Sequence, residues 1–491
     1  MKTSSKNRPS TWLPILILLL ALGGLLRLLD LTDPPLDFHP SRQLRNSLAA
    51  RGIYYSLLPS ATDEQRELAA SFERAVGRYE PPVSESLVAL TWLLTGGENY
   101  AAPRVLGALF WLTAGVALFD LMRRATSPWA ALIGLAFYLV LPFSVQASRS
   151  FQPDPLMTSA FVAGIYFLYR WSEEQSWKHA LLAGVFLGLA ALIKVVIASL
   201  IGVVALALVF FTLKKDFWKS KQVWAMAALV AIPAYVYYIF LNQGRSTEYF
   251  FAWTVALIKL ITSTDFYSKW LAFLGSLFGL TVIFLSLAGT LISKPRLRCL
   301  LISLWIGYLL YGLILPFQMY THSYYHIQLI PLLALGLASA VNPLVETVSS
   351  QGWGWRAGFV GLVVAVVGYQ SWVARSVLVA EDFRHEPAFW KGVGEAIPAD
   401  ADVIALTQDY GYRLMFFGWR KVDLWRLNTG LSEVRGGEQD GGDFVDEIDG
   451  MDYFLVTAFN QLDKQPELKK FLEQYPIATQ GDGYVLYDLR K

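Results

Sequence analysis

The sequence predicts a polytopic α-helical membrane protein with a small α/β domain near its C-terminal end. The hydrophobic fraction is 55% and the charged fraction only 16%, whereas a soluble chain carries about 25% charged residues to cover a surface that faces water. Apolar runs long enough to cross a bilayer core of roughly 30 Å recur along most of the chain. Beyond residue 380, charge rises and the apolar runs shorten. The change in composition predicts two domains, residues 1–379 and 380–491.

Composition also excludes several classes of protein. The net charge is +2, so no strong electrostatic field favours nucleic acid as a partner. Cys299 is the single cysteine, which excludes an intrachain disulfide and a cysteine-based metal site. Aromatic residues reach 14%, with 17 Trp and 24 Tyr, and these residue types gather at membrane interfaces. The first apolar run, residues 12–29, lacks a small-residue cleavage motif, so we expect a retained first helix.

About eleven apolar runs are predicted to span the membrane. The stretch on either side of Lys194 must turn back on itself, which places this lysine between two helices. The runs lie near residues 12–29, 102–122, 128–147, 153–170, 178–193, 195–213, 221–241, 270–292, 299–316, 325–345 and 356–376.

Orientation follows from lysine and arginine in short loops, which stay on the cytoplasmic side. With eleven spans, every basic cluster falls on one side, so we expect a cytoplasmic N-terminus and an extracytoplasmic C-terminal domain in the inner or plasma membrane. The clusters are Lys2, Lys6 and Arg8; Arg123 and Arg124; Lys214, Lys215, Lys219 and Lys221; and Lys294, Arg296 and Arg298.

The first outer loop, residues 30–100, is long and patterned. Ser41 is a plausible N-cap of a helix that Gly52 would stop, and Asp63 opens a second helix. Both are predicted to be amphipathic helices that lie in the plane of the membrane interface. Residues 84–95 form an apolar segment that is too short to span. They follow a proline pair, which kinks the chain.

The C-terminal region has the pattern of a mixed α/β domain. Predicted strands cover 403–407, 453–457 and 484–489, and residues 466–475 have helical spacing. From its place beside the outer face, we hypothesise that this domain docks the acceptor. Another outer segment, residues 244–269, is rich in aromatic residues and is expected to be half-submerged. A glycine-rich stretch is predicted to be a flexible loop and not a phosphate cradle, because no strand-to-helix context surrounds Gly436, Gly437, Gly441 and Gly442.

Four short polar segments mark the candidate site. They are residues 37–43, 79–82, 148–154 and 321–326, all on the outer side of the predicted topology. Ionisable groups near membrane depth are costly and usually functional. The convergence of these segments on one face is the main argument from the residues for an active site.

Each candidate also has a structural interpretation. Loop position alone favours Asp37 as a surface carboxylate, like its neighbours Asp30 and Asp33. Glu80 is consistent with a residue that initiates a turn before two prolines. Arg149 and Asp154 would form an ion pair that closes a hairpin. Lys194 would extend its amine to water from a hairpin tip. A metal site or simple packing would both fit His322 and His326, whose spacing of four places them on one helical face.

The chain resembles the multi-spanning glycosyltransferases that use polyprenyl-phosphate sugars, which have the GT-C fold. This group contains the protein O-mannosyltransferases and the lipid A aminoarabinose transferase. The chain is most similar to members of glycosyltransferase family 39. The resemblance covers about residues 10–380 and rests on D-F-H-x-x-R-Q at 37–43, E-P-P at 80–82, R-x-x-x-P-D-x-L at 149–156, Lys194 between two helices, and H-x-Y-Y at 322–325 followed by Pro331. Members carry a basic residue before the two prolines, where this chain has Glu80.

The resemblance implies an inverting transfer of sugar from a lipid phosphate to an acceptor hydroxyl. Asp37 would be the catalytic base, and the departing phosphate would be held by cations. The implied donor-binding residues are Arg149, Lys194, Arg42, Tyr324 and Tyr325. His39, Glu80, Asp154, His322 and His326 would position the acceptor or a divalent metal ion. No nucleotide cofactor is needed, because a polyprenyl phosphate is already a good leaving group.

Two other functions compete with this one. A transporter or flippase of lipid-linked sugars would predict ionisable groups near mid-membrane and repeated halves, and neither pattern is present. A sensor would leave the long first outer loop unexplained. The expected partners are therefore a polyprenyl-phosphate-linked sugar, the lipid bilayer and an acceptor that is a glycolipid, a glycan or a secreted protein.

Overall fold

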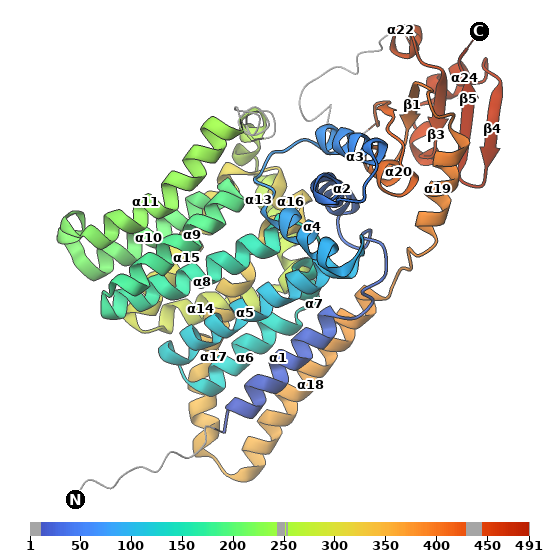
Figure 1. The fold of residues 1–491 in the computed structure, drawn as a ribbon. Coiled ribbons are helices and arrows are strands. Elements are labelled where there is room, and N and C mark those ends of the chain that lie inside the picture. Colours follow the sequence, from blue (N-terminus) through green and yellow to red (C-terminus); the bar gives the residue numbers. More distant parts are fainter. Residues whose placement is uncertain (1–10, 243–250, 252–253, 429–443, 491) are drawn as a thin grey trace, which may run out of the picture. The chain divides into compact units, whose positions relative to one another are not determined.

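The computed structural model describes residues 11–242, 251, 254–428 and 444–490 (Figure 1). These residues divide into two compact units. Unit 1 comprises residues 11–31, 79–84 and 101–380 as far as they are described, and unit 2 comprises the described parts of 32–78, 85–100 and 381–491. The last segment of unit 2 begins at Glu381, one residue after the predicted start of the second domain at residue 380. That unit also takes in most of the first outer loop.

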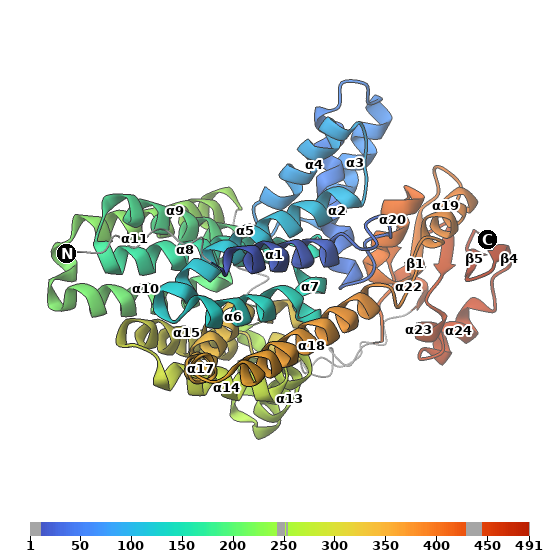
Figure 2. The ribbon, with the colours of Figure 1, turned by 90° about the horizontal axis from the view of Figure 1, so that it is seen from below.

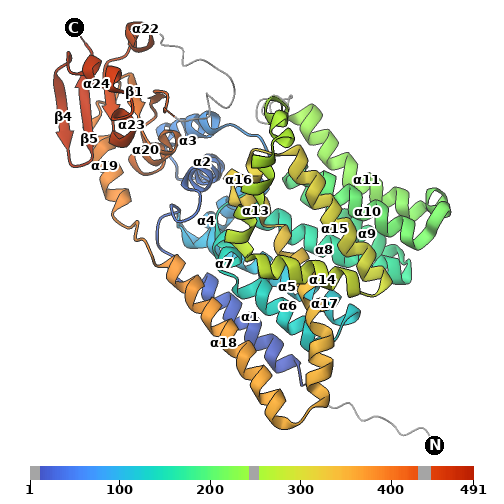
Figure 3. The same ribbon diagram turned by 180° about the vertical axis from the view of Figure 1, so that it is seen from behind.

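Unit 1 is a bundle of helices, in which α1 lies beside α18 (Figures 1 and 3). Its elements are α1 Leu13–Arg27, α5 Ala101–Ala125, α6 Pro128–Val140, α7 Pro142–Arg149, α8 Pro153–Glu174, α9 Trp177–Ile193, η1 Val195–Ile197, α10 Ala198–Leu213, η2 Lys214–Lys219, α11 Lys221–Tyr235, η3 Val236–Leu241, η4 Val255–Thr262, α13 Thr264–Phe278, α14 Leu280–Ile292, α15 Pro295–Ile314, α16 Gln318–Thr321, η5 Ser323–His326, α17 Leu329–Ser350 and α18 Trp353–Leu378.

Among the described residues, six helices are long and apolar enough to cross a membrane, or up to eight if each of two bent pairs is one span. Every predicted run falls on a helix or on one of these pairs. The helices α1 and α9 are apolar but have only 15 and 17 residues. The chain is therefore an integral membrane protein, while the predicted number of eleven spans stays a prediction.

Both bent pairs have a local cause. The helices α6 and α7 meet at 58° before Pro142, which has no backbone N–H to continue the helix. The helices α13 and α14 meet at 95° around Gly279, whose φ of +77° favours glycine. The predictions of one continuous helix over residues 128–147 and over residues 270–292 are therefore both wrong. Gly279, with its positive φ, ends α13 and changes the direction of the chain before α14 begins.

Unit 2 combines loop helices with the C-terminal α/β domain (Figure 2). The sheet has the order β2-β1-β3-β5-β4, in which β1 runs parallel to β2 and β3, and β5 is antiparallel to β3 and β4. The predicted strands are present, and β2 and β4 were missed. The elements are α2 Pro40–Leu57, α3 Asp63–Val76, α4 Val83–Thr95 (its first two residues belong to unit 1), α19 Glu386–Ala396, β1 Val403–Leu406, η6 Asp409–Gly411, α20 Tyr412–Gly418, β2 Asp423–Leu424, α22 Phe444–Ile448, β3 Tyr453–Val456, α23 Phe459–Leu462, α24 Pro466–Leu472, β4 Ile477–Gly481 and β5 Tyr484–Asp488.

The first loop helix departs from its prediction at both ends. His39, with φ of +50°, precedes α2, so Ser41 lies inside the helix and is not its N-cap. The helix also continues through Gly52. A Cβ at Gly52 would lie 2.6 Å from Oε2 of Glu73 on α3. Glycine is therefore needed there for close helix packing and not for a stop. The predicted start of α3 is confirmed, with a capping box between Thr62 and Gln65.

The apolar faces of α2 and α3 are buried in protein. Leu44 and Leu48 of α2 and Phe72 of α3 are fully buried in a core that also contains Trp390 of α19 and Leu455 of β3. The apolar faces are therefore covered by protein and not by lipid, and the orientation of these helices in the plane of the membrane interface stays a prediction. Their periodicity is that of any half-buried helix, and it does not specify what covers the apolar face.

Some predicted features lie outside the described residues. They are the basic cluster at the N-terminus, half of the aromatic residues of the 244–269 segment, and the glycine-rich loop, that is Lys2, Lys6, Arg8, Tyr249, Phe250, Trp253, Gly436, Gly437, Gly441 and Gly442.

Candidate active site

A buried ion pair lies where α8 begins and α9 ends. Asp154 is in the first turn of α8, whose N-terminal dipole favours a negative charge. Lys194 follows α9 in an extended conformation. Its Nζ lies 2.5 Å from Oδ1 of Asp154, and the two residues are 4% and 1% exposed. Lys194 therefore does not extend to water, and the alternative of a solvated hairpin tip is wrong.

Two tyrosines cover the same ammonium group. Lys194 Nζ is 4.4 Å from the ring centroid of Tyr325 and 5.0 Å from that of Tyr324. Such cation–π contacts stabilise a desolvated cation. The tyrosines belong to η5, so three separate segments of unit 1 meet at one charge. The structure thereby brings together four predicted site residues, namely Lys194, Asp154, Tyr324 and Tyr325.

Arg149 is the last residue of α7 and binds the chain just after the end of α1. Its guanidinium group donates to the carbonyl oxygen of Leu29 and, at 2.9 Å, to that of Asp30. Arg104 of α5 donates to the neighbouring carbonyl of Leu31 at 3.0 Å. Asp154, which the structural interpretation paired with Arg149, forms an ion pair with Lys194. Arg149 and Arg104 instead fix the last residues of unit 1 before the chain passes into unit 2.

Arg27, near the end of α1, was missed by the sequence analysis. It is fully buried and donates to Oγ of Ser148 at 2.7 Å and to the carbonyl of Leu139 at 2.9 Å. The side chain thus holds α7, and with it the position of Arg149. The available signal was an arginine inside the first apolar run, where an unpaired charge would be costly.

The two histidines do not form a pair. His326 is buried, with Nδ1 2.5 Å from the hydroxyl of Tyr308 and Nε2 3.0 Å from the carbonyl of Met319. His322 precedes η5 in an extended conformation, and its Nδ1 lies 2.7 Å from Oγ1 of Thr321. The prediction of a shared helical face is wrong because the segment is a short 3₁₀ turn. His326 supports the bundle, and a role in binding acceptor or metal does not fit its contacts.

Glu80 belongs to a segment held near the end of α9. The carbonyl of Tyr79 accepts a hydrogen bond from Nδ2 of Asn242 at 3.3 Å. One turn earlier, the hydroxyl of Tyr238 donates to the carbonyl of Leu192 at 3.1 Å, two residues before Lys194. The end of η3 therefore connects the Glu80 segment with the turn that carries Lys194.

Asp37 lies in unit 2, just before α2. Its Oδ1 accepts a hydrogen bond from Nε2 of Gln43 at 3.0 Å, and the same amide donates to the carbonyl of Phe38 at 2.9 Å. Because Gln43 is buried, its amide holds the Asp37 carboxylate from the protein interior. Burial, with the Arg42 guanidinium as the second cause, lowers the pKa of His39 to about 4. The imidazole of His39 is consequently neutral near pH 7.

No group of three or more histidine, cysteine, aspartate or glutamate side chains that could hold a metal ion occurs in the described part of the chain. Asp154 is bound to Lys194 and His326 to Tyr308 and Met319. The predicted candidates for metal binding are thus not gathered into one cluster within those residues.

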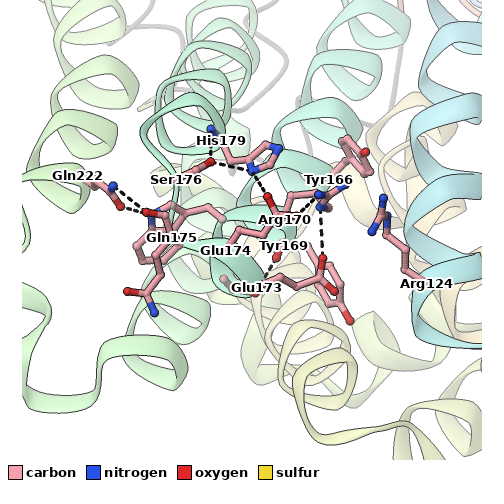
Figure 4. Close-up of polar contacts among 12 residues, drawn as sticks. Arg124, Tyr166, Tyr169, Arg170, Glu173, Glu174, Gln175, Ser176, His179 and Gln222 are labelled. Carbon is pink, nitrogen blue, oxygen red and sulfur yellow. Dashed lines mark hydrogen bonds and ion pairs between the residues drawn. The ribbon is translucent and has the colours of Figure 1, made fainter.

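A second polar network marks the opposite end of α8 (Figure 4). Arg170 forms ion pairs with Glu173 and Glu174, and Ser176 caps α9. Arg170 follows Asp154 by 16 residues on α8, which corresponds to about 24 Å along the helix at 1.5 Å per residue. The helix therefore has one end with the candidate site and another end with a surface charge network.

Known proteins share this architecture. ArnT from Cupriavidus metallidurans, solved with undecaprenyl phosphate, is 14% identical, with a TM-score of 0.63 over 98% of each chain. The oligosaccharyltransferase AglB from Archaeoglobus fulgidus, solved with an inhibitory peptide and a dolichol-phosphate, is 12% identical. Its TM-score is 0.57 over 98% of this chain and 74% of that one. The arabinofuranosyltransferase AftD from Mycobacteria is 15% identical, with a TM-score of 0.51 over 90% of this chain and 36% of that one. The chain has the GT-C glycosyltransferase fold.

The sequence itself also matches a family. Residues 79–240 match the family described as dolichyl-phosphate-mannose-protein mannosyltransferase, and no curated protein matches. The matched range contains Glu80, Arg149, Asp154 and Lys194 of this GT-C chain. The predicted class of enzyme, a membrane glycosyltransferase that uses a lipid-linked sugar, is confirmed by the family match together with the fold, and the flippase alternative is not favoured.

Proposed function

We propose that this chain transfers a sugar, with inversion, from a polyprenyl-phosphate donor to an acceptor hydroxyl at the outer face of the membrane. The observation that carries the proposal is the buried Lys194–Asp154 pair beneath Tyr324 and Tyr325. The buried ammonium group of Lys194 would attract the phosphate of the donor. The two tyrosine rings beside it would contact the sugar or the isoprenoid chain that the phosphate carries.

The donor is proposed to bind unit 1 through its phosphate. Lys194 and Arg149 would balance the charge that grows on the departing polyprenyl phosphate, whereas Arg42, which lies in unit 2 on α2, would orient Asp37. The rings of Tyr324 and Tyr325 would contact the sugar or the first isoprene units. The structures with undecaprenyl phosphate and dolichol-phosphate support a lipid phosphate as the leaving group.

Asp37 is proposed as the general base for the acceptor hydroxyl. Gln43 fixes one carboxylate oxygen, which limits the rotation of the group. A neutral His39 and Glu80 would position the acceptor, which is a glycolipid, a glycan or a hydroxyl of a secreted protein. His322 is kept as an acceptor contact, because it is only partly buried.

The orientation rests on charge. Arg123 and Arg124 lie in the last turn of α5, Lys214 and Lys219 are the first and last residues of η2, and Arg298 lies in the first turn of α15. Short loops rich in these residues stay in the cytoplasm. Asp154 and Lys194 are at the other end of α8 and α9, so we assign the site to the extracytoplasmic side of the inner or plasma membrane.

The test measures release of polyprenyl phosphate by purified protein in lipid nanodiscs. A panel of polyprenyl-phosphate hexoses and pentoses is offered with a cell-envelope extract as acceptor. We expect one donor to support release, and Asp37→Asn to lose release while it still binds that donor. Asp63→Asn, an exposed carboxylate of the same loop, is the matched control and should remain active. Release that is unchanged in Asp37→Asn would remove Asp37 as the base.

The same assay tests whether transfer requires a divalent metal ion. Transfer is measured after treatment with EDTA and after addition of Mg²⁺ or Mn²⁺. We propose that side-chain cations alone stabilise the leaving phosphate, so chelation should leave the rate unchanged. A loss that Mg²⁺ or Mn²⁺ restores would assign the phosphate charge to a divalent ion instead.

A further inference from the structure

Asp33 is a buried carboxylate that the proposed reaction does not use. It is 1% exposed, although burying an ionised carboxylate is costly unless it is hydrogen-bonded or paired. Its Oδ1 accepts the backbone N–H of Phe383 at 2.9 Å. The Arg384 guanidinium lies 3.8 Å from the same oxygen and donates to Oγ1 of Thr32 at 3.3 Å. Two segments 350 residues apart in sequence are thus joined by one carboxylate.

The chain between Asp33 and Asp37 has little freedom. Pro34 and Pro35 fix two φ angles, and the N–H of Leu36 donates to the carbonyl of Pro34 at 2.7 Å. Leu36 is 3% exposed and belongs to the core that contains Trp390. A shift of Asp33 would therefore be passed along a stiff segment to the Asp37 carboxylate.

Beyond Asp37, α2 is held by a second contact with the C-terminal domain. Arg51 is 4% exposed and binds both oxygens of Glu98, at 2.8 and 2.7 Å. Its Nη1 donates to the carbonyl of Phe416 at 2.8 Å, and its guanidinium carbon lies 4.3 Å from the ring centroids of Phe416 and Trp419. The loop that carries Asp37 is therefore fixed on both sides to elements after residue 380.

We infer that Asp33 is a positioning residue, which anchors the Asp37 loop to the C-terminal domain through the backbone N–H of Phe383. The inference rests on the proposed role of Asp37. It assigns the C-terminal domain a structural part in the active site, because α19 and the sheet complete the core under α2 and α3. Donor binding, which is proposed for unit 1, does not depend on this anchor.

The experiment compares Asp33→Ala with Asp33→Asn in the full chain, in the nanodisc assay. An alanine cannot accept the Phe383 N–H, whereas the asparagine carbonyl oxygen can. We expect Asp33→Ala to lower kcat by on the order of 10- to 100-fold through misplacement of the base, with an unchanged KM and Kd for the donor. Asp33→Asn should retain most of the activity. Asp463→Ala, which removes an exposed ion pair with Lys469 in the same unit, is the matched control.

A double variant tests whether Asp33 acts through Asp37. In the Asp37→Asn background, Asp33→Ala should cause no further loss of the residual rate. A further loss of the same factor, or a full kcat in Asp33→Ala, would overturn the inference. So would an Asp33→Asn variant that is folded but as slow as Asp33→Ala. If Asp33→Ala aggregates, Asp33→Ser replaces it, because its shorter side chain does not reach the Phe383 N–H, and a full kcat would again overturn the inference.

The two proposals fail in different ways. An active Asp37→Asn variant would refute the catalytic base. An inactive Asp37→Asn variant together with a fully active Asp33→Ala variant would refute only the anchor.

Discussion

Lys194 illustrates what a single residue contributes in this chain. The sequence identifies it as a lysine between two apolar runs, which is equally consistent with a solvated tip and with a donor site. Its actual partners, Asp154 and Tyr325, come from other segments. The pairing is decided by how α8, α9 and η5 pack, because nothing in the local sequence of Lys194 specifies these neighbours.

Substitutions in the Lys194–Asp154 ion pair should affect thermal stability and sugar transfer differently. Lys194→Met leaves Asp154 buried without its cation, which costs about 3–5 kcal/mol in comparable buried pairs. We expect a large drop in thermal stability and a loss of donor binding. The double variant Lys194→Met/Asp154→Asn should recover most of the stability but no transfer. Thermal unfolding in detergent and the release assay measure the two effects, and recovery of transfer in the double variant would contradict a role of Lys194 in phosphate binding.

At the scale of elements, glycines set how closely helices approach. Gly52 allows α2 to approach Glu73 of α3, and Gly107 of α5 faces the backbone of α7, where an added Cβ would lie 2.6 Å from the carbonyl oxygen of Ser148. A glycine in a helical pattern is ordinarily interpreted as a stop or a weak point. The difference between a stop and a close approach depends on a partner that is distant in sequence. The end predicted at Gly52 was wrong for this reason.

Gly107 gives a testable case at this scale. Gly107→Ala should push α7, which carries Arg149, away from α5. We expect a loss of about 1–3 kcal/mol in stability, as for other overpacked sites, and a lower rate of transfer. Gly202→Ala is the matched control, because no atom lies within 4 Å of a Cβ at Gly202. Thermal unfolding and donor affinity are the measurements, and equal behaviour of the two variants would refute close packing at Gly107.

At the scale of the whole molecule, the C-terminal domain is part of unit 2 together with the first outer loop. The sequence predicted its α/β character and its boundary, and also suggested an independent acceptor-docking module. The core that α2 and α3 share with α19 and the sheet indicates instead that the first outer loop needs the C-terminal domain in order to fold. Without the domain, Leu44, Leu48 and Phe72 would be exposed.

Removal of residues 381–491 tests this dependence. We expect the truncated chain to lose transfer at every acceptor concentration and to retain donor binding in unit 1. An acceptor-docking module predicts instead a raised acceptor KM, with transfer that saturating acceptor restores. Donor affinity and the acceptor dependence of release separate the two outcomes.

The sequence by itself determined the membrane class, the positions of the apolar helices and the α/β character of the last 110 or so residues, and it selected Asp154, Lys194, Tyr324 and Tyr325 as candidates that the structure brings together. These features depend on composition, on local periodicity and on short motifs, which neighbouring residues specify. The tertiary structure alone decided the partner of Asp154, the bend at Gly279, the protein cover over α2 and α3, and the contacts of Arg27 and Asp33. Each of these depends on a contact between segments distant in the chain, and long-range contacts leave no local periodicity from which to predict them.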